Sequence, residues 1–132
     1  MAKIVAAFAA SHAPLVARDW HLLPEPIKNR LSAAYRELGR RLTEIQPDVI
    51  IEIAPDHWSN FFINNLPNVC IGVGEAHEGP PEPFLQNYPY NPMQGSPDLA
   101  MHILKTALDN DFEPSVSHRM KLDHGFSIPL MR

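Results

Sequence analysis

The sequence predicts an α/β protein, with a largely parallel or mixed central sheet flanked by helices. Apolar, β-branched runs of strand length at residues 4–10 and 48–54 enclose a long amphipathic segment. A strand, helix and strand in this order form the unit that builds a parallel sheet. An apolar stretch at residues 126–131 resembles the opening of another element, so we expect a sheet that is incomplete at the C-terminus. The length of 132 residues predicts one domain, residues 1–132.

The first strand is expected at residues 4–10, although this run also resembles a short secretion signal. We favour a buried strand because the run is at the short limit for an export signal. A helix is expected from Ile27 to Gln46, where apolar residues recur at three- and four-residue steps and charged residues fill the opposite face. Pro47 ends this helix, and residues 48–54 form the second predicted strand.

The second half of the chain has weaker signals. Residues 61–63 and 69–73 predict a hairpin. The proline-rich segment 80–97 excludes a helix or a central strand, and its Phe84, Tyr88 and Tyr90 could either line a pocket or pack on the core. Ser96, Pro97 and the following Asp predict a helix start, and residues 112–117 predict a further strand.

Composition limits the partners and the compartment. The chain has 11 Lys and Arg residues and 15 Asp and Glu residues, and it contains no basic run. This composition argues against a nucleic-acid surface or a polybasic membrane anchor. The sequence has no apolar stretch of the ~20 residues needed to span a bilayer. The single Cys70 cannot form an internal disulfide, which favours a reducing, cytoplasmic location and a role for Cys70 as a small buried hydrophobe.

Three histidines follow strand-like runs: His12, His57 and His124. A right-handed crossover places the C-terminal ends of the first two predicted strands at one edge of the sheet, where α/β proteins bind ligands. Neutral imidazoles at His12 and His57 could begin a metal centre, which would also need a carboxylate. Asp56 is adjacent to His57 and points away from it on an extended chain, so a supporting or capping role suits it better. Neither Glu52 nor Glu75 is a compelling third ligand.

The pair Asp123 and His124 also indicates chemistry. A neighbouring carboxylate can raise the basicity of a histidine and fix its tautomer, and Gly125 permits a tight backbone turn. The alternative is a turn in which Asp123 caps a helix. His77 lies between glycines, and we expect it in an exposed loop.

Four segments carry a resemblance to a known family. The chain resembles the class III extradiol ring-cleavage dioxygenases over residues 4–130, in Ser11-His12-Ala13-Pro14, in the run from Pro47 to Trp58, in Cys70-Ile71-Gly72-Val73-Gly74 and in the run from Met120 to Leu130. The resemblance implies an Fe(II) cofactor held by His12 and His57, with a catechol-type substrate and O₂. It also implies that His124 is the acid–base catalyst and that Asp123 orients it.

The resemblance leaves the family's remaining site residues unassigned. Family members are much longer, and their glutamate ligand and second catalytic histidine would follow Arg132. We therefore expect either the N-terminal portion of an enzyme or a naturally short relative that binds metal poorly or acts as a partner subunit. A fragment would leave sheet surface uncovered, so we also expect self-association or a companion chain. Two other functions stay open: a zinc-type hydrolase that activates water at the same histidines, and a non-catalytic subunit of a dioxygenase complex.

Overall fold

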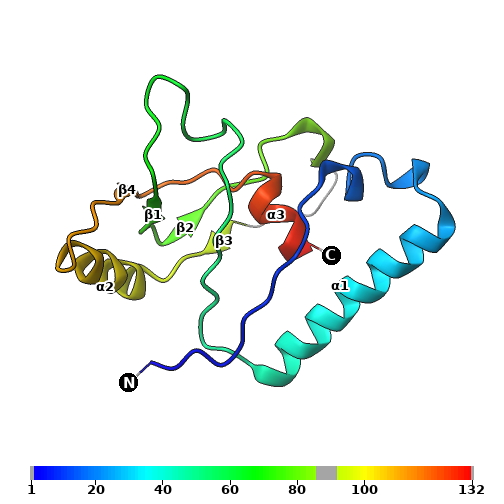
Figure 1. The fold of residues 1–132 in the computed structure, drawn as a ribbon, viewed down its shortest axis with the longest axis horizontal. Helices are drawn as coiled ribbons and strands as arrows, with labels where there is room; N and C mark the ends of the chain where they lie inside the picture. Colours follow the sequence, from blue (N-terminus) through cyan, green and yellow to red (C-terminus); the bar gives the residue numbers. More distant parts are fainter. Residues whose placement is uncertain (1, 86–91, 132) are drawn as a thin grey trace. The chain divides into compact units, whose positions relative to one another are not determined.

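The computed structural model describes residues 2–85 and 92–131 (Figure 1). The chain divides into two compact units. Unit 1 comprises Met1–Ala54 and His124–Arg132, and unit 2 comprises Pro55–Asp123. Unit 1 is thus built from two stretches that are far apart in the sequence. Helices and a small, partly parallel set of strands confirm the α/β class.

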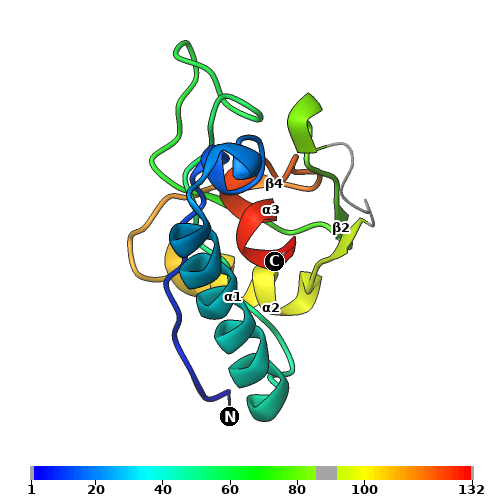
Figure 2. The ribbon, with the colours of Figure 1, turned by 90° about the vertical axis from the view of Figure 1, so that its right-hand side faces the viewer.

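The long helix of unit 1 is α1, Glu25–Ile45, close to the predicted bounds. It runs without interruption in both views of the ribbon (Figures 1 and 2). At its end Gln46 adopts a left-handed φ of 48° and donates its backbone N–H to the carbonyl of Leu42, an arrangement that commonly terminates helices. Pro47 follows and cannot continue the helix.

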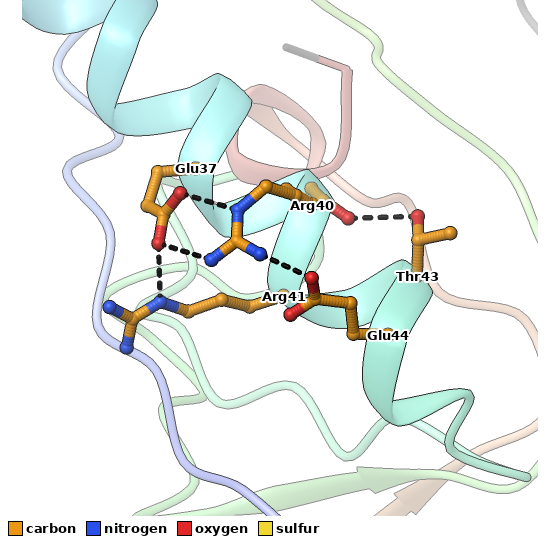
Figure 3. A network of polar contacts seen from close by, with 6 residues as sticks. Glu37, Arg40, Arg41, Thr43 and Glu44 are labelled. Atoms are coloured by element: carbon orange, nitrogen blue, oxygen red, sulfur yellow. Dashed lines mark hydrogen bonds and ion pairs between the residues drawn. The ribbon is translucent and has the colours of Figure 1, made fainter.

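The charged face of α1 is exposed to solvent, as its pattern predicts, and Figure 3 shows the polar contacts between its side chains. Glu37 accepts hydrogen bonds from Arg40 and Arg41, and Arg40 also pairs with Glu44. The two arginines lower the pKa of Glu37 to about 2. Exposed pairs of this kind contribute little to stability, so this face serves solvation and local helix support.

The strands predicted at residues 4–10 and 48–54 are wrong. Both segments are extended, but neither takes part in a β-ladder among the described residues, and Figure 1 draws both as coil. Their apolar side chains are open to solvent, with 87% of Ile4 and 93% of Ile53 exposed. A β-branched composition favours a strand only where a partner supplies hydrogen bonds and a surface to pack on. The expected strand–helix–strand unit is therefore absent from the described part of unit 1.

The parallel pairing lies in unit 2. Strand β1, Cys70–Gly72, pairs in parallel with β4, Ser115–Ser117, and the register places Cys70 opposite Ser115. Helix α2, Pro97–Leu108, lies between them in the sequence and begins where Ser96 and Pro97 predicted. The predicted hairpin of residues 61–63 and 69–73 is wrong, because β1 pairs with β4 and Phe62 forms only an isolated bridge with Asn65.

A second, antiparallel pair completes the strands described in unit 2. It consists of β2, Ala76–His77, and β3, Met93–Gln94. In the proline-rich segment, Phe84 lies in the short 3-10 helix η3, Pro83–Leu85, whereas Tyr88 and Tyr90 fall outside the described residues. Two further 3-10 helices, η1 at Pro14–Val16 and η2 at Trp20–Leu22, precede α1.

The last helix, α3, spans His124–Met131 and belongs to unit 1. Ser127 and Ile128 of this helix are almost completely buried. In unit 2 the buried side chains include one charged group, Asp123, together with Val73, Leu85, Leu104, Met120 and Leu122. Within the described ranges, every helix is too short or too polar to cross a bilayer.

Candidate metal and acid–base site

One contact of the site joins His57 and Asp123 in unit 2. The Asp123 carboxylate accepts a hydrogen bond from the backbone N–H of His57 at 2.7 Å, and the same oxygen lies 3.3 Å from the His57 Nδ1. Asp123 is 0% exposed, whereas the His57 side chain is one-third exposed. A buried carboxylate needs such partners, because an ionised group without them is costly to desolvate. Asp123 therefore holds the backbone of His57 by a hydrogen bond and lies close to its ring.

Asp56 shapes the turn that follows His57. Its carboxylate accepts hydrogen bonds from the backbone N–H groups of Asn60 and Phe61, at 3.1 Å and 3.0 Å. Trp58, inside this turn, has a φ of 62°, which is rare for a bulky residue. Asp56 therefore supports the turn that follows His57, in keeping with the supporting role expected for it.

His12 lies in unit 1, two residues before the start of η1. The buried Tyr35 of α1 donates its hydroxyl hydrogen bond to the backbone carbonyl of Ser11 at 2.5 Å. This bond ties α1 to the residue that precedes His12. The sequence pattern placed Tyr35 on the apolar face of the helix and gave no sign of the hydroxyl's role, because its acceptor is 24 residues away.

His124 is the first residue of α3 and approaches His12 within unit 1. The centroids of the two rings are 6.0 Å apart, and the ring planes are inclined by 48°. Both side chains are partly buried. The four predicted site residues thus form two pairs: His12 with His124 in unit 1, and His57 with Asp123 in unit 2. The chain passes between the units twice, and one of these two boundaries is the peptide bond that links Asp123 to His124.

His77 is not in the exposed loop that we expected. It lies in β2 and is partly buried, and a Cβ built on Gly72 would lie only 3.0 Å from its Cε1 atom. The His77 Nδ1 accepts a hydrogen bond from the backbone N–H of Met120 at 3.3 Å, and burial lowers the pKa of the ring. The glycines on β1 and its following turn are small enough to admit the imidazole, which sequence spacing alone could not show.

The remaining polar candidates are separate from these pairs. Cys70 is part of β1 and only partly buried, and burial raises the pKa of its thiol. A raised pKa disfavours a reactive thiolate. Glu52 lies in unit 1, where burial raises the pKa of its carboxyl to about 7.

The donor chemistry of the pairs fits a metal of the first transition series. A histidine whose Nδ1 faces a carboxylate presents Nε2 as its coordinating nitrogen, and metal-binding histidines are commonly oriented in this way. His57 has this arrangement with Asp123. Imidazole nitrogens together with carboxylate oxygens suit Fe(II) and Zn(II) alike, so the donor atoms by themselves leave the metal open.

Fold and contacts thus define an α/β protein in which histidines are paired with a buried carboxylate and with one another. Residues 6–132 match the family described as the catalytic LigB subunit of aromatic ring-opening dioxygenase. The chain belongs to this family, which confirms the resemblance drawn from the sequence.

Curated relatives agree with this assignment. The chain is 32% identical over 124 residues to a 2,3-dihydroxyphenylpropionate/2,3-dihydroxicinnamic acid 1,2-dioxygenase of Rhodococcus sp., covering 93% of this chain and 37% of the relative. It is 31% identical over 121 residues to the protein of the same name from Klebsiella pneumoniae subsp. pneumoniae, covering 91% and 36%. A relative from Dechloromonas aromatica is 28% identical, with the same coverage. The chain therefore spans little more than a third of the length of these relatives.

Proposed function

We propose that this chain is part of a non-haem Fe(II)-dependent extradiol dioxygenase that cleaves catechol-type rings with O₂ in aromatic catabolism. The observation that carries the proposal is the His57–Asp123 pair, a histidine held by its backbone beside a buried carboxylate, in a chain of the ring-opening dioxygenase family. We assign it to the N-terminal portion of a single catalytic domain. The discontinuous make-up of unit 1 supports one domain, because the chain leaves this unit and returns to it.

His12 and His57 are the proposed iron ligands, and Asp123 orients His57. The Asp123 carboxylate near Nδ1 favours coordination through Nε2. The hydrogen bond from the His57 N–H to this carboxylate holds the His57 backbone in place. Within unit 1, the Tyr35 hydroxyl holds the carbonyl of Ser11, directly before His12. Bound Fe(II) would supply the open coordination positions and the electron transfer that a reaction between a catechol and O₂ requires.

His124 is the proposed acid–base catalyst. An imidazole nitrogen can accept a proton from a catechol hydroxyl and return it later in the reaction. Its ring centroid is 6.0 Å from that of His12, which supports a location beside a substrate held next to this ligand. Asp123 precedes His124 directly, so the same short segment would orient a ligand and deliver the proton-transfer group.

Oxygen consumption tests the reaction. The protein that contains this chain is loaded with Fe(II) under anaerobic conditions and supplied with O₂ and a panel of dihydroxy aromatics. The panel includes 2,3-dihydroxyphenylpropionate, named for the relatives, with a 1,4-dihydroxybenzene as the control that lacks adjacent hydroxyls. Uptake of O₂ with an adjacent diol, and not with the control, is expected. Absence of uptake with every adjacent diol would overturn the proposed activity.

Metal content and turnover separate the roles of the histidines. His12→Ala and His57→Ala are expected to lose most of the bound iron, whereas His102→Ala, on the exposed side of α2, retains it. His124→Ala is expected to retain iron and to turn over roughly 10²- to 10⁴-fold more slowly, the range for a lost acid–base group. Iron content equal to wild type in His12→Ala or His57→Ala would remove that residue from the ligand set.

We propose in addition that the chain works with further polypeptide, either a companion chain or another copy of itself. The apolar extended segments of unit 1 support this, because Ile4, Ile50, Ile51 and Ile53 expose more than half of their surface. Exposed apolar runs of this kind mark surfaces that are usually covered. The single cysteine supports a reducing, cytoplasmic location.

A further inference from the structure

We propose that Asn60 is a positioning residue. Its carboxamide forms two hydrogen bonds with the backbone of Lys121, a contact that we call the clasp, and thereby holds His57 against Asp123. Asn60 Oδ1 accepts the backbone N–H of Lys121 at 2.7 Å, and Asn60 Nδ2 donates to the backbone carbonyl of the same residue at 2.9 Å. All four residues belong to unit 2. The two bonds together reproduce the pairing that a neighbouring strand would make with Lys121.

The extended segment around Lys121 is also hydrogen-bonded along its other edge, by Glu78. Glu78 forms a parallel bridge with Lys121, donating its N–H to the carbonyl of Met120 and accepting the N–H of Leu122. In an extended chain, these flanking groups point to the side opposite the N–H and carbonyl of Lys121. The carboxamide of Asn60 therefore takes the place of a third strand, and the segment before Asp123 is held from both edges.

Asp56 prepares the carboxamide for this contact. Its Oδ1 accepts a hydrogen bond from Asn60 Nδ2 at 2.7 Å, in addition to the bond from the Asn60 backbone N–H. The Nδ2 of Asn60 thus donates to both Asp56 and Lys121, while its Oδ1 accepts from Lys121. A side chain that is held in this way loses little further entropy when it binds the backbone.

The clasp affects His57 by keeping the two segments that carry His57 and Asp123 close together. Residues 56–60 and 121–123 are joined at two points, Asn60 to Lys121 and His57 to Asp123. The second point includes the buried carboxylate that lies 3.3 Å from His57 Nδ1. Loss of the first point would let the two segments move apart, and the short His57–Asp123 contact would lengthen.

NMR spectroscopy of the 132-residue chain tests the clasp directly. Asn60→Leu removes both bonds to Lys121 at similar volume, and Asn64→Leu is the matched control at an exposed position of the same loop. We expect the His57 amide proton to exchange at least about tenfold faster in Asn60→Leu, as a lost hydrogen bond allows. We also expect the ¹⁵N shifts of the His57 ring to move toward the Nε2–H tautomer. Both signals should remain at wild-type values in Asn64→Leu.

A structural role without effect on His57 predicts a different pattern. Asn60→Leu would then lower the melting temperature. The exchange rate of the His57 amide would stay within twofold of wild type, and the ¹⁵N shifts of its ring would not move. That result would overturn the proposal. If Asn60→Leu fails to fold, Asn60→Ser decides, because its shorter hydroxyl cannot span both backbone groups and should give the same change at His57.

The consequence for metal binding rests on the proposed function. Titration with Fe(II) under anaerobic conditions, in competition with a chelator, should show 10- to 100-fold weaker binding by Asn60→Leu than by wild type, the usual cost of losing support around a ligand. Asn64→Leu should bind as wild type does. If the wild-type chain binds no Fe(II), the metal assignment fails while the His57 signals still decide the clasp. If wild type binds iron and His57 is unaffected by Asn60→Leu, only the clasp is wrong.

Discussion

The carboxylate of Asp123 receives the backbone N–H of His57 at 2.7 Å across 66 residues of sequence. The same carboxylate oxygen lies 3.3 Å from the Nδ1 of that histidine. One buried carboxylate thus holds the His57 backbone and lies close to its ring. This relationship makes Asp123 the most informative position for substitution.

Two substitutions of Asp123 should separate its effect on stability from its effect on metal binding. Asp123→Ala leaves the His57 N–H without this acceptor, and we expect a loss of about 1–3 kcal/mol in the free energy of unfolding, measured by urea denaturation. Asp123→Asn preserves the shape and an acceptor oxygen but removes the charge near Nδ1, so Fe(II) affinity should fall roughly 10- to 100-fold. Asp109→Asn, at an exposed site paired with Lys105, is the control. Unchanged iron affinity in Asp123→Asn would contradict the orienting role.

The hydroxyl of Tyr35 should contribute to stability in addition to the burial of its ring. Tyr35→Phe removes the donor to the Ser11 carbonyl and should destabilise the chain by about 0.5–1.5 kcal/mol, the usual net value of one hydrogen bond. Tyr35→Leu removes the buried ring as well and should cost more. Thermal unfolding of both variants gives the comparison. A Tyr35→Phe melting curve identical to wild type would show that the bond contributes no net stability.

Glu52 should make stability depend on pH. Burial raises the pKa of its carboxyl to about 7 in the folded chain, above the value of about 4.3 in an unfolded chain. The folded state thus favours the protonated form, so this contribution is fully present below the unfolded pKa and is lost as pH rises through about 7.

Glu52→Gln should remove this dependence, because its amide remains neutral. We expect wild type to lose on the order of 1–3 kcal/mol relative to Glu52→Gln between pH 4 and pH 8, since one pKa unit corresponds to about 1.4 kcal/mol. Denaturant midpoints across this range provide the measurement, with Glu113→Gln at an exposed position as the control. Parallel curves for wild type and Glu52→Gln would contradict the raised pKa.

The exposed apolar segments of unit 1 should drive association of the isolated chain. Ile50 and Ile53 are exposed in an extended segment that has no ladder partner among the described residues. We expect concentration-dependent self-association in sedimentation velocity runs, reduced by Ile50→Lys with Ile53→Lys, because charges on an unpaired edge oppose pairing. Leu108→Lys, an exposed apolar position at the end of α2, serves as the control. A strictly monomeric wild-type chain would argue against this surface.

The sequence by itself determined the elements whose signals are local. The repeat of apolar residues predicted α1, the Ser96–Pro97 start predicted α2, and Pro47 marked the end of the first helix. Motifs at His12, His57 and Asp123–His124 indicated the family, which the match over residues 6–132 confirms. Such signals are readable because helix periodicity, caps and short motifs depend on neighbours within a few residues.

Only the tertiary structure decided which distant residues meet. Residues 48–54 have the composition of a strand, yet the described chain gives them no hydrogen-bonding partner, whereas β1 finds its partner 45 residues away in β4. The contacts of Asp123 with His57, of Tyr35 with Ser11 and of Asn60 with Lys121 likewise span long stretches of sequence. Strand pairing and site geometry depend on what packs alongside a residue, and no local pattern of residue types specifies that neighbour.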